Sequence, residues 1–168
     1  MKTIISLIGC LLLFSTLSYS QINRAFPSVQ LKKLNGESIS TDDIKNNKNP
    51  ILIIVWATWC HHSTDGMSLI SEEYFDEWEN SYNLKVVGIS VDDARNIPKV
   101  SPAIYGNGWD LFEHYLDPNA DFKRAMGINQ PPHLFILNKD RKVVWSFNSF
   151  NPGDEGEIEN ILETLNSK

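Results

Sequence analysis

The sequence has 168 residues, of which 42% are hydrophobic and 21% charged, and its formal net charge is −6. This length suits one globular domain with a sizeable core. No block of basic residues stands out, so we expect neither nucleic-acid binding nor binding to an anionic membrane. The mild acidity is typical of a soluble surface.

The first twenty residues are predicted to be a signal peptide, separate from the domain that follows. Lys2 supplies a positive charge, residues 4–17 are almost entirely apolar, and Ser18 and Ser20 are small residues at the positions that a signal peptidase recognises. The apolar run is too short for a comfortable transmembrane helix. We therefore expect cleavage after Ser20, a periplasmic or secreted location, and one domain over residues 21–168 with no membrane span.

Cys10 offers a second interpretation of this leader, because residues 7–10 resemble the cleavage motif of bacterial lipoproteins. The apolar run before Cys10 would then be very short, so lipidation is the minor alternative. Once the leader is removed, Cys60 is the single thiol of the chain, and an internal disulfide is excluded. An unpaired cysteine in an oxidising compartment calls for an explanation, and a dimer linked through Cys60 is one.

After the leader, the sequence predicts a β-hairpin, a buried strand and a helix. Residues 29–34 and 37–40 flank Asn35-Gly36, a pair typical of hairpin turns. Residues 51–56 form a continuous run of β-branched and aromatic side chains, which indicates a strand buried on both faces of a sheet. Over residues 61–80, hydrophobic side chains recur at the spacing of an amphipathic helix.

The middle of the chain predicts a second buried strand over residues 84–91. We interpret Asp92 and Asp93, which follow it, as solvated carboxylates at the strand end. Pro98 and Pro102 lie in the next stretch. Because proline disrupts a helix interior, we expect a short helix and a loop there rather than one long helix.

The last third of the chain predicts a short strand within residues 109–116, a helix over 117–126, two hairpin strands over 133–137 and 142–147, and an amphipathic helix over 154–165. Strands that alternate with helices, followed by a hairpin and a closing helix, are typical of an α/β sandwich around a mixed sheet.

Cys60 lies where the buried strand meets the first long helix. A helix N-terminus presents unpaired amide hydrogens and the positive end of the helix dipole, which stabilise a thiolate. His61 and His62 would add positive charge at mildly acidic pH. The thiolate is the nucleophile in disulfide exchange, so Cys60 is the candidate reactive group.

The passage Ile51–Cys60, ILIIVWATWC, resembles the strand and active-site segment of the thioredoxin superfamily. It is most similar to the exported TlpA/ResA-like branch of thiol-disulfide oxidoreductases (redoxins), which reads W-A-x-W-C-x-x-C. Residues 85–92, 127–137 and 151–155 resemble further segments of that branch, in the same order. The resemblance covers roughly residues 22–166 and implies a thioredoxin-like α/β fold, a central mixed β-sheet flanked by helices, with an N-terminal β-hairpin.

The resemblance also implies roles for single residues. Pro132, rather than Pro131, takes the place of the cis-proline that packs against the active-site cysteine and offers backbone groups to a substrate. His62 matches the histidine in the C-P-H-C centre of DsbA-like oxidants. The candidate substrate-binding residues are Trp59, His61, Pro131 and His133.

The chain departs from this branch at the position of the second, resolving cysteine, which is Ser63. Gly66 and Ile54 stand where relatives keep buried acids. A mixed disulfide on Cys60 would have no internal thiol to release it. We therefore predict a monothiol exchange protein that acts on exported protein thiols or disulfides, needs a small external thiol and uses no cofactor. The candidate catalytic residues are Cys60 as nucleophile, His62 and the helix amides as its stabilisers, Ser63 as a hydrogen-bond donor to it, and Pro132.

Three other functions remain open. A binding module without catalysis would hold exported client proteins in the same groove around Cys60 and Pro132. A one-cysteine peroxidase would need threonine or serine three residues before the cysteine, where this chain has Ala57. Binding of copper or zinc by Cys60 and the nearby histidines is disfavoured, because adjacent residues rarely face one ion and a structural site takes four ligands. We expect no metal site.

Overall fold

The computed structural model of the chain describes residues 23–167. The predicted signal peptide, its cleavage point after Ser20 and the alternative lipidation site at Cys10 lie outside the described residues. Within residues 23–167, every helix is too short or too polar to cross a membrane.

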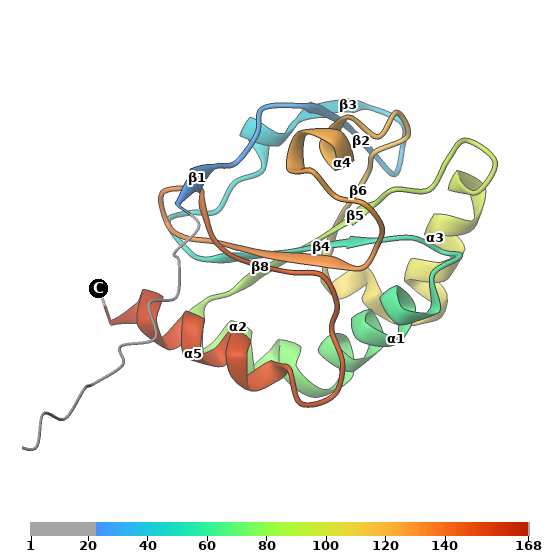
Figure 1. Cartoon of the computed structure of the whole chain (residues 1–168). Coiled ribbons are helices and arrows are strands. Elements are labelled where there is room, and N and C mark those ends of the chain that lie inside the picture. The colour runs from blue at the N-terminus through green and yellow to red at the C-terminus, as the bar shows by residue number, and fades with distance from the viewer. Residues whose placement is uncertain (1–22, 168) are drawn as a thin grey trace, which may run out of the picture.

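Eight strands form one sheet in the order β1-β8-β7-β4-β5-β6-β2-β3 (Figure 1). They are β1 (Arg24–Ala25), β2 (Gln30–Lys33), β3 (Ser38–Ser40), β4 (Ile51–Trp56), β5 (Lys85–Ser90), β6 (Glu113–Leu116), β7 (His133–Leu137) and β8 (Lys142–Phe147). The central strands β4, β5 and β6 are parallel, whereas β7 is antiparallel to β4 and β2 to β6. The predicted mixed sheet and N-terminal hairpin are thus confirmed, and the hairpin extends the sheet beyond β6.

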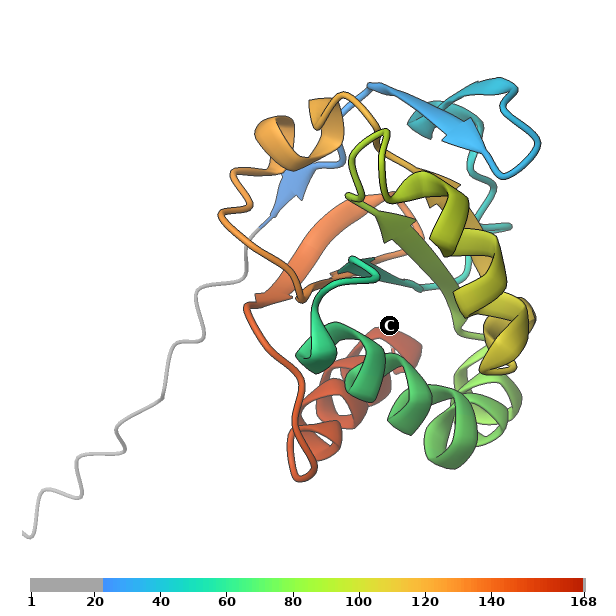
Figure 2. The same ribbon diagram turned by 90° about the vertical axis from the view of Figure 1, so that its right-hand side faces the viewer.

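Helices cover both faces of the sheet. They are α1 (His61–Leu69), α2 (Phe75–Tyr82), α3 (Ile97–Gly106), α4 (Asp121–Met126), α5 (Glu155–Asn166), the 3-10 turns η1 (Thr41–Asp43) and η3 (Trp109–Leu111), and the π-helical turn η2 (Ile70–Tyr74). Figures 1 and 2 show α1, α2 and α5 together on one face and α4 on the other. The predicted helix over 61–80 is one continuous helical segment, with η2 at its middle.

Side chains of β4 alternate between two hydrophobic cores. The even-numbered ones pack with α1, α2, α3 and α5, and the odd-numbered ones with α4. All six residues of β4 are buried, as a strand covered on both faces requires. Because β4 leads directly into the turn before α1, this burial on both faces fixes the position of the N-terminus of α1.

The helix α3 corrects one prediction, because Pro102 does not end it. Pro98 lies in the first turn of α3, where a missing N–H costs no helical hydrogen bond. Pro102, inside the helix, removes one bond in the i to i−4 ladder. Val100 and Ile104 are buried against the core, and their burial offsets that loss.

Candidate functional site

Cys60 is the N-cap residue of α1, and it lies at the end of a tight turn after β4. This turn, residues 57–60, is closed by a hydrogen bond from the backbone N–H of Cys60 to the carbonyl oxygen of Ala57, at 3.1 Å. The carbonyl oxygen of Cys60 accepts from Ser63 and Thr64, which starts the helix. Cys60 is half-buried, and its backbone is fixed by hydrogen bonds on both sides.

The thiol of Cys60 faces the loop that precedes β7. Its Sγ lies 3.5 Å from the carbonyl oxygen of Pro131 and donates a hydrogen bond to it. The peptide bond between Pro131 and Pro132 is cis, which confirms the assignment of Pro132 as the cis-proline. As a thiol, the side chain turns toward Pro131 and makes no capping hydrogen bond with the amides of α1.

Ser63, at the position of a resolving cysteine, is 1% exposed. Its hydroxyl is buried and has no hydrogen-bond partner among residues 23–167. The predicted hydrogen bond from Ser63 to Cys60 is therefore not formed, since the thiol is directed to Pro131. A buried hydroxyl without a partner costs about 1–3 kcal/mol, so this position suits a less polar group of similar size.

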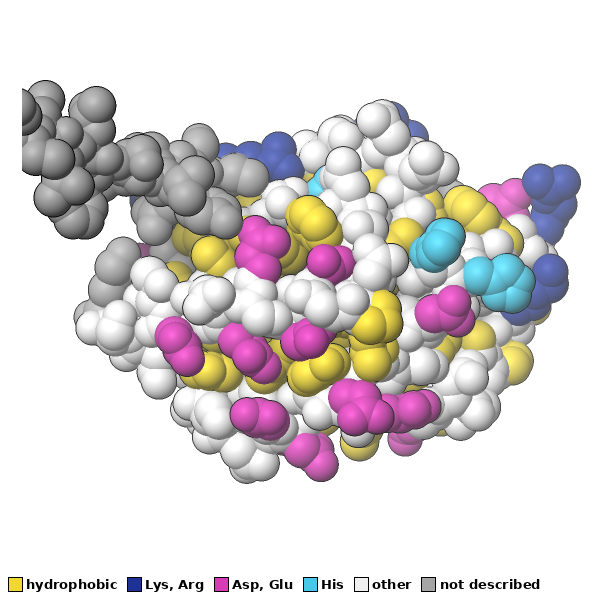
Figure 3. All heavy atoms as spheres, turned by 60° about the horizontal axis from the view of Figure 1, so that its bottom comes forward, with side chains coloured by type: hydrophobic (Ala, Val, Ile, Leu, Met, Phe, Trp, Pro, Cys, Tyr) yellow, Lys and Arg dark blue, Asp and Glu magenta, His cyan; other side chains and the backbone are white. Residues whose placement is uncertain are grey.

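Trp59, His61 and His62 surround Cys60 as exposed side chains. Trp59 is 56% exposed, unusually high for an indole, and so offers an apolar surface directly beside the thiol. On the helical side of the molecule, Figure 3 shows two neighbouring histidine side chains at one end, away from most of the acidic side chains. All three side chains are therefore exposed to solvent beside the thiol.

His133 differs from the other predicted site residues, because its ring lies on the α4 side of the sheet. It stacks on Phe135, a member of that core, with ring centroids 4.4 Å apart, and its Nε2 shares a hydrogen bond with the hydroxyl of Ser146 at 2.7 Å. Burial, with a smaller effect of the charge on Arg24, lowers the pKa of His133. Over residues 23–167, no group of three or more His, Cys, Asp or Glu side chains is arranged to hold a metal ion.

Asp92 lies beside the turn 57–60, and the expectation of a solvated carboxylate there is wrong. Instead of being solvated, it is 1% exposed. Its Oδ1 accepts from the hydroxyl of Thr58 at 2.7 Å, and its Oδ2 accepts from the backbone N–H of Thr58 and the hydroxyl of Ser90, both at 2.9 Å. The alternation of β5, in which Ser90 points inward, continues for two residues beyond the strand and was the signal that could have identified Asp92.

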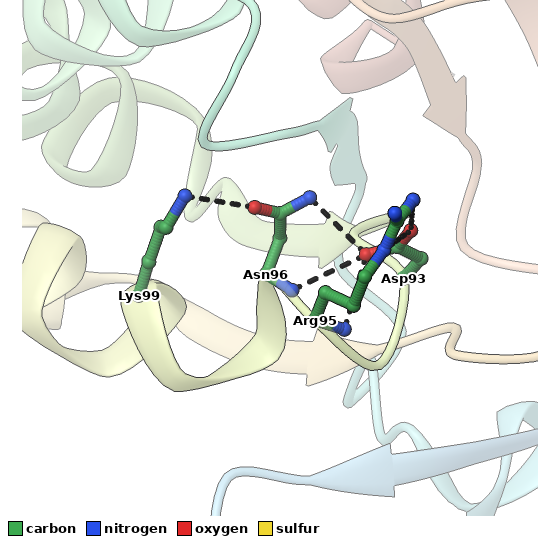
Figure 4. Close-up of polar contacts among 4 residues, drawn as sticks. All are labelled: Asp93, Arg95, Asn96 and Lys99. Carbon is green, nitrogen blue, oxygen red and sulfur yellow. Dashed lines mark hydrogen bonds and ion pairs between the residues drawn. The ribbon is translucent and has the colours of Figure 1, made fainter.

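The next residue, Asp93, behaves as predicted for a carboxylate at the surface. Its carboxylate accepts hydrogen bonds only from Arg95 and Asn96 of its own loop, and Asn96 in turn accepts from Lys99 (Figure 4). The hydrogen bond from Arg95 lowers the pKa of Asp93. Two adjacent acids therefore have opposite surroundings, one enclosed beside the turn that carries Cys60 and one at the surface.

The order of the strands, the cysteine at the start of α1 and the cis-proline facing it define a thioredoxin-like fold. The sequence profile of the AhpC/TSA family matches residues 22–146. The chain belongs to this family, which confirms the predicted membership of the redoxin branch. A comparison with proteins of curated function found no match.

Several solved structures share this architecture. A thioredoxin-like protein from Porphyromonas gingivalis is 32% identical, with 86% of this chain and 95% of that chain covered and a TM-score of 0.73. The thioredoxin domain of a thiol-disulfide oxidoreductase from Bacteroides vulgatus is 16% identical (86% and 98% covered, TM-score 0.68). A thiol-disulfide oxidoreductase from Bacteroides fragilis is 17% identical (82% and 99% covered, TM-score 0.66). At these identities the two Bacteroides proteins show the common fold alone.

Proposed function

We propose that this chain is an exported protein that exchanges disulfides through Cys60 alone. One observation carries the proposal. The thiol is half-buried at the N-terminus of α1, 3.5 Å from the carbonyl oxygen that precedes cis-Pro132, and a serine occupies the place of the resolving cysteine. A peptide that docks against this loop would bring its own disulfide to the sulfur of Cys60.

The exchange has two balanced steps. First, the thiolate of Cys60 attacks one sulfur of a client disulfide, the new S–S bond joins Cys60 to the client, and the second client sulfur leaves as a thiolate. Ser63 cannot attack the mixed disulfide, because a hydroxyl does not take part in thiol-disulfide exchange. An external thiolate therefore attacks the client sulfur, forms a disulfide with the client and releases the thiolate of Cys60.

Binding without chemistry is a second candidate function, and the exposure of Trp59 favours it. An indole that is 56% exposed beside a thiol offers contact area whether or not the thiol reacts. A Cys60→Ala variant separates the two functions. Client capture would survive this change in a binding module and would be lost in an exchange protein.

Two features favour disulfides over peroxides as the substrate. Ala57 stands where a peroxidase of this fold needs a hydroxyl. Thr58, one residue later, has a hydroxyl, but that hydroxyl donates its hydrogen to Asp92 and is not directed at the sulfur. The family match alone therefore does not make peroxide the preferred substrate.

The decisive experiment is trapping in the native compartment. Cells that express the protein are quenched in acid, and every protein disulfide-linked to Cys60 is identified by mass spectrometry. Without a resolving thiol, mixed disulfides should accumulate on the wild-type chain and be absent from Cys60→Ser. An empty trap, with Cys60 recovered as a free thiol, would refute the exchange function.

Export is tested on the same material by sequencing the mature N-terminus. Cleavage after Ser20 leaves a chain that begins at Gln21, whereas lipidation leaves one that begins at a modified Cys10. An intact N-terminus in the cytoplasm would refute export.

A further inference from the structure

The carboxylate of Asp92 is bound by hydrogen bonds and not by a positively charged side chain. Among residues 23–167 it forms no ion pair, yet it is 1% exposed and accepts three hydrogen bonds. A buried carboxylate costs several kcal/mol unless its oxygens are fully hydrogen-bonded. A neutral residue would fill this space at a lower cost, so packing alone does not account for a charged group here.

Asp92 is connected to the reactive cysteine through one residue. The hydrogen-bonded pairing of β4 with β5 ends just before the turn 57–60, and in that turn Asp92 binds both the backbone N–H and the hydroxyl of Thr58. The same turn ends at Cys60, whose sulfur faces the carbonyl oxygen of Pro131. The position of the sulfur therefore depends on the turn 57–60. This turn lies beyond the β4–β5 pairing, and the hydrogen bonds from Thr58 to Asp92 hold it in place.

We propose that Asp92 is the positioning residue for the Cys60 nucleophile. Acting through Thr58, it fixes the turn 57–60 so that the sulfur stays beside Pro131 while a peptide disulfide docks. It touches neither reacting sulfur. Hydrogen bonds to a carboxylate are about twice as strong as neutral ones, and a displacement of about 1 Å at a reacting atom costs about a hundredfold in rate. The inference rests on the proposed function in one respect, that Cys60 is the nucleophile.

Four variants test it. Asp92→Asn removes the charge, and Thr58→Val removes the hydroxyl while keeping the shape. Thr58→Ser keeps both donors and is the rescue variant. Asp93→Asn is the matched control, because it alters an adjacent carboxylate that bonds only within its own loop (Figure 4).

Each variant is measured with two probes. The first is a short peptide whose cysteine is activated as a mixed disulfide with thionitrobenzoate, which must dock to react. The second is iodoacetamide at pH 9, which alkylates any accessible thiolate. We expect Asp92→Asn and Thr58→Val to slow peptide exchange by about tenfold or more, with alkylation within about twofold of wild type. Thr58→Ser and Asp93→Asn should match wild type with both probes.

Peptide exchange at the wild-type rate in folded Asp92→Asn and Thr58→Val would overturn the proposal. The proposal would also be overturned if Thr58→Ser lost peptide exchange as Thr58→Val does. That result would show that the rate depends on the packing of the threonine methyl group and not on its hydroxyl. If both rates rise instead, the variants open the site by local unfolding, and the proposal also fails.

Amide hydrogen exchange tests the positioning role independently of any reaction at Cys60. The N–H of Thr58 should exchange faster in Asp92→Asn than in wild type or Asp93→Asn, and Cys60 should follow it. A wild-type chain that reacts with no peptide disulfide would refute the proposed function, whereas an unchanged Thr58 amide in Asp92→Asn would refute the positioning role.

Discussion

The hydroxyl of Ser63 is buried one helical turn from Cys60, and it is unused. Ser63 donates its backbone N–H to the carbonyl oxygen of Cys60 at 3.0 Å, but its side chain bonds to nothing among residues 23–167. The thiol of Cys60 is directed to Pro131 instead. The site thus keeps the space for a second thiol while lacking the sulfur.

Ser63→Cys should convert the protein into one that completes its own cycle. Residues three apart on a helix are neighbours, and a thiol is less penalised than a hydroxyl by burial without a partner. We expect an internal disulfide with Cys60 after oxidation and a fall in trapped mixed disulfides relative to wild type. Thiol titration and the trapping experiment measure these. Two free thiols after oxidation of the variant would contradict the expectation.

Ser63→Ala is the control for that experiment and carries a prediction of its own. Removing a buried, unpaired hydroxyl should raise the free energy of unfolding by about 1 kcal/mol, without any disulfide. Urea denaturation measures the change. A loss of stability would show that the hydroxyl has a partner in solution.

Gly88→Ala should destabilise the fold, because His114 occupies the space that a side chain at Gly88 would need. A Cβ there would lie 2.6 Å from Nδ1 of His114 and 3.2 Å from Nε1 of Trp56. Overpacking of this kind costs about 1–3 kcal/mol. Gly156→Ala, in α5 with open space around the new Cβ, is the matched control and should gain about 0.5–1 kcal/mol. Equal effects of the two changes in urea denaturation would be inconsistent with this contact.

The stability of the protein should fall as the pH drops below about 6.5, the pKa of histidine in an unfolded chain. Burial lowers the pKa of His114, although its hydrogen bond to the carbonyl of Trp109 and the charge of Asp110 oppose that change. The folded state then binds fewer protons than the unfolded state, so the stabilisation is complete above this pH and is lost below it. Half-buried His133, whose pKa is also lowered, acts in the same direction.

His114→Gln should flatten this pH dependence, by up to about 1.4 kcal/mol per pH unit. Urea denaturation at pH 5 and pH 7.5 gives the slopes of wild type and variant. If the free energy of unfolding of His114→Gln changed with pH as steeply as that of wild type, groups other than His114 would cause the pH dependence.

The α2 and α5 face should become more stable with added salt. Residues 61–82 and 155–166 contain no lysine or arginine, and Figure 3 shows their side of the molecule with many acidic side chains and scarcely any basic ones. Acidic neighbours in α5, Glu155 among them, add to burial in raising the pKa values of Tyr74 and Tyr82. Salt screens such repulsion, so the melting temperature should rise with sodium chloride concentration. A flat response would show that the acids are too far apart to interact.

Substitutions at two glutamates of α5 distinguish the effect of charge repulsion from the effect of a lost hydrogen bond. Glu157 accepts from the indole of Trp145 at 2.9 Å, whereas Glu163 is exposed and lies four residues after Glu159. Glu163→Lys should stabilise the chain at low salt by about 0.3–0.5 kcal/mol. Glu157→Lys should destabilise it by about 1–3 kcal/mol, because the buried indole loses its acceptor. Thermal melts at low salt compare the two, and equal shifts would refute the distinction.

Sequence patterns located the elements that are strongly periodic or fully apolar. The bounds predicted for β4, β7 and β8 agree with the structure. Nearly continuous burial leaves few alternatives for β4 and β7, and the alternating burial of β8 follows the turn over residues 138–141. The cis-proline was also assigned correctly, since the motif around Pro132 is specific. The two-residue strand β1 cannot be predicted in this way, because two residues carry no detectable period.

The finer arrangement of the site depended on contacts between distant segments, which no local pattern reports. The alternation of β5 favours Asp92 over Asp93 as the enclosed acid, but its partner Thr58 lies 34 residues earlier, and no local pattern identifies that contact. The direction of the Cys60 thiol is set by Pro131, 71 residues later. His133 directly follows the cis-proline in sequence, and its alternation in β7 stacks its ring on Phe135, a contact that the proline motif does not indicate.

The two strands at the ends of the sheet decide where a foreign β-strand could be added to it. One edge is β1, with two residues, and the other is β3, with three. At the β3 edge, three residues offer few free backbone groups for the addition of a foreign strand, whereas at the other edge β1 covers only Lys142 and Val143 of β8. The β3 end of the sheet is therefore the poorer acceptor for a foreign strand, and the outer edge of β8 beyond Val143 is the better one.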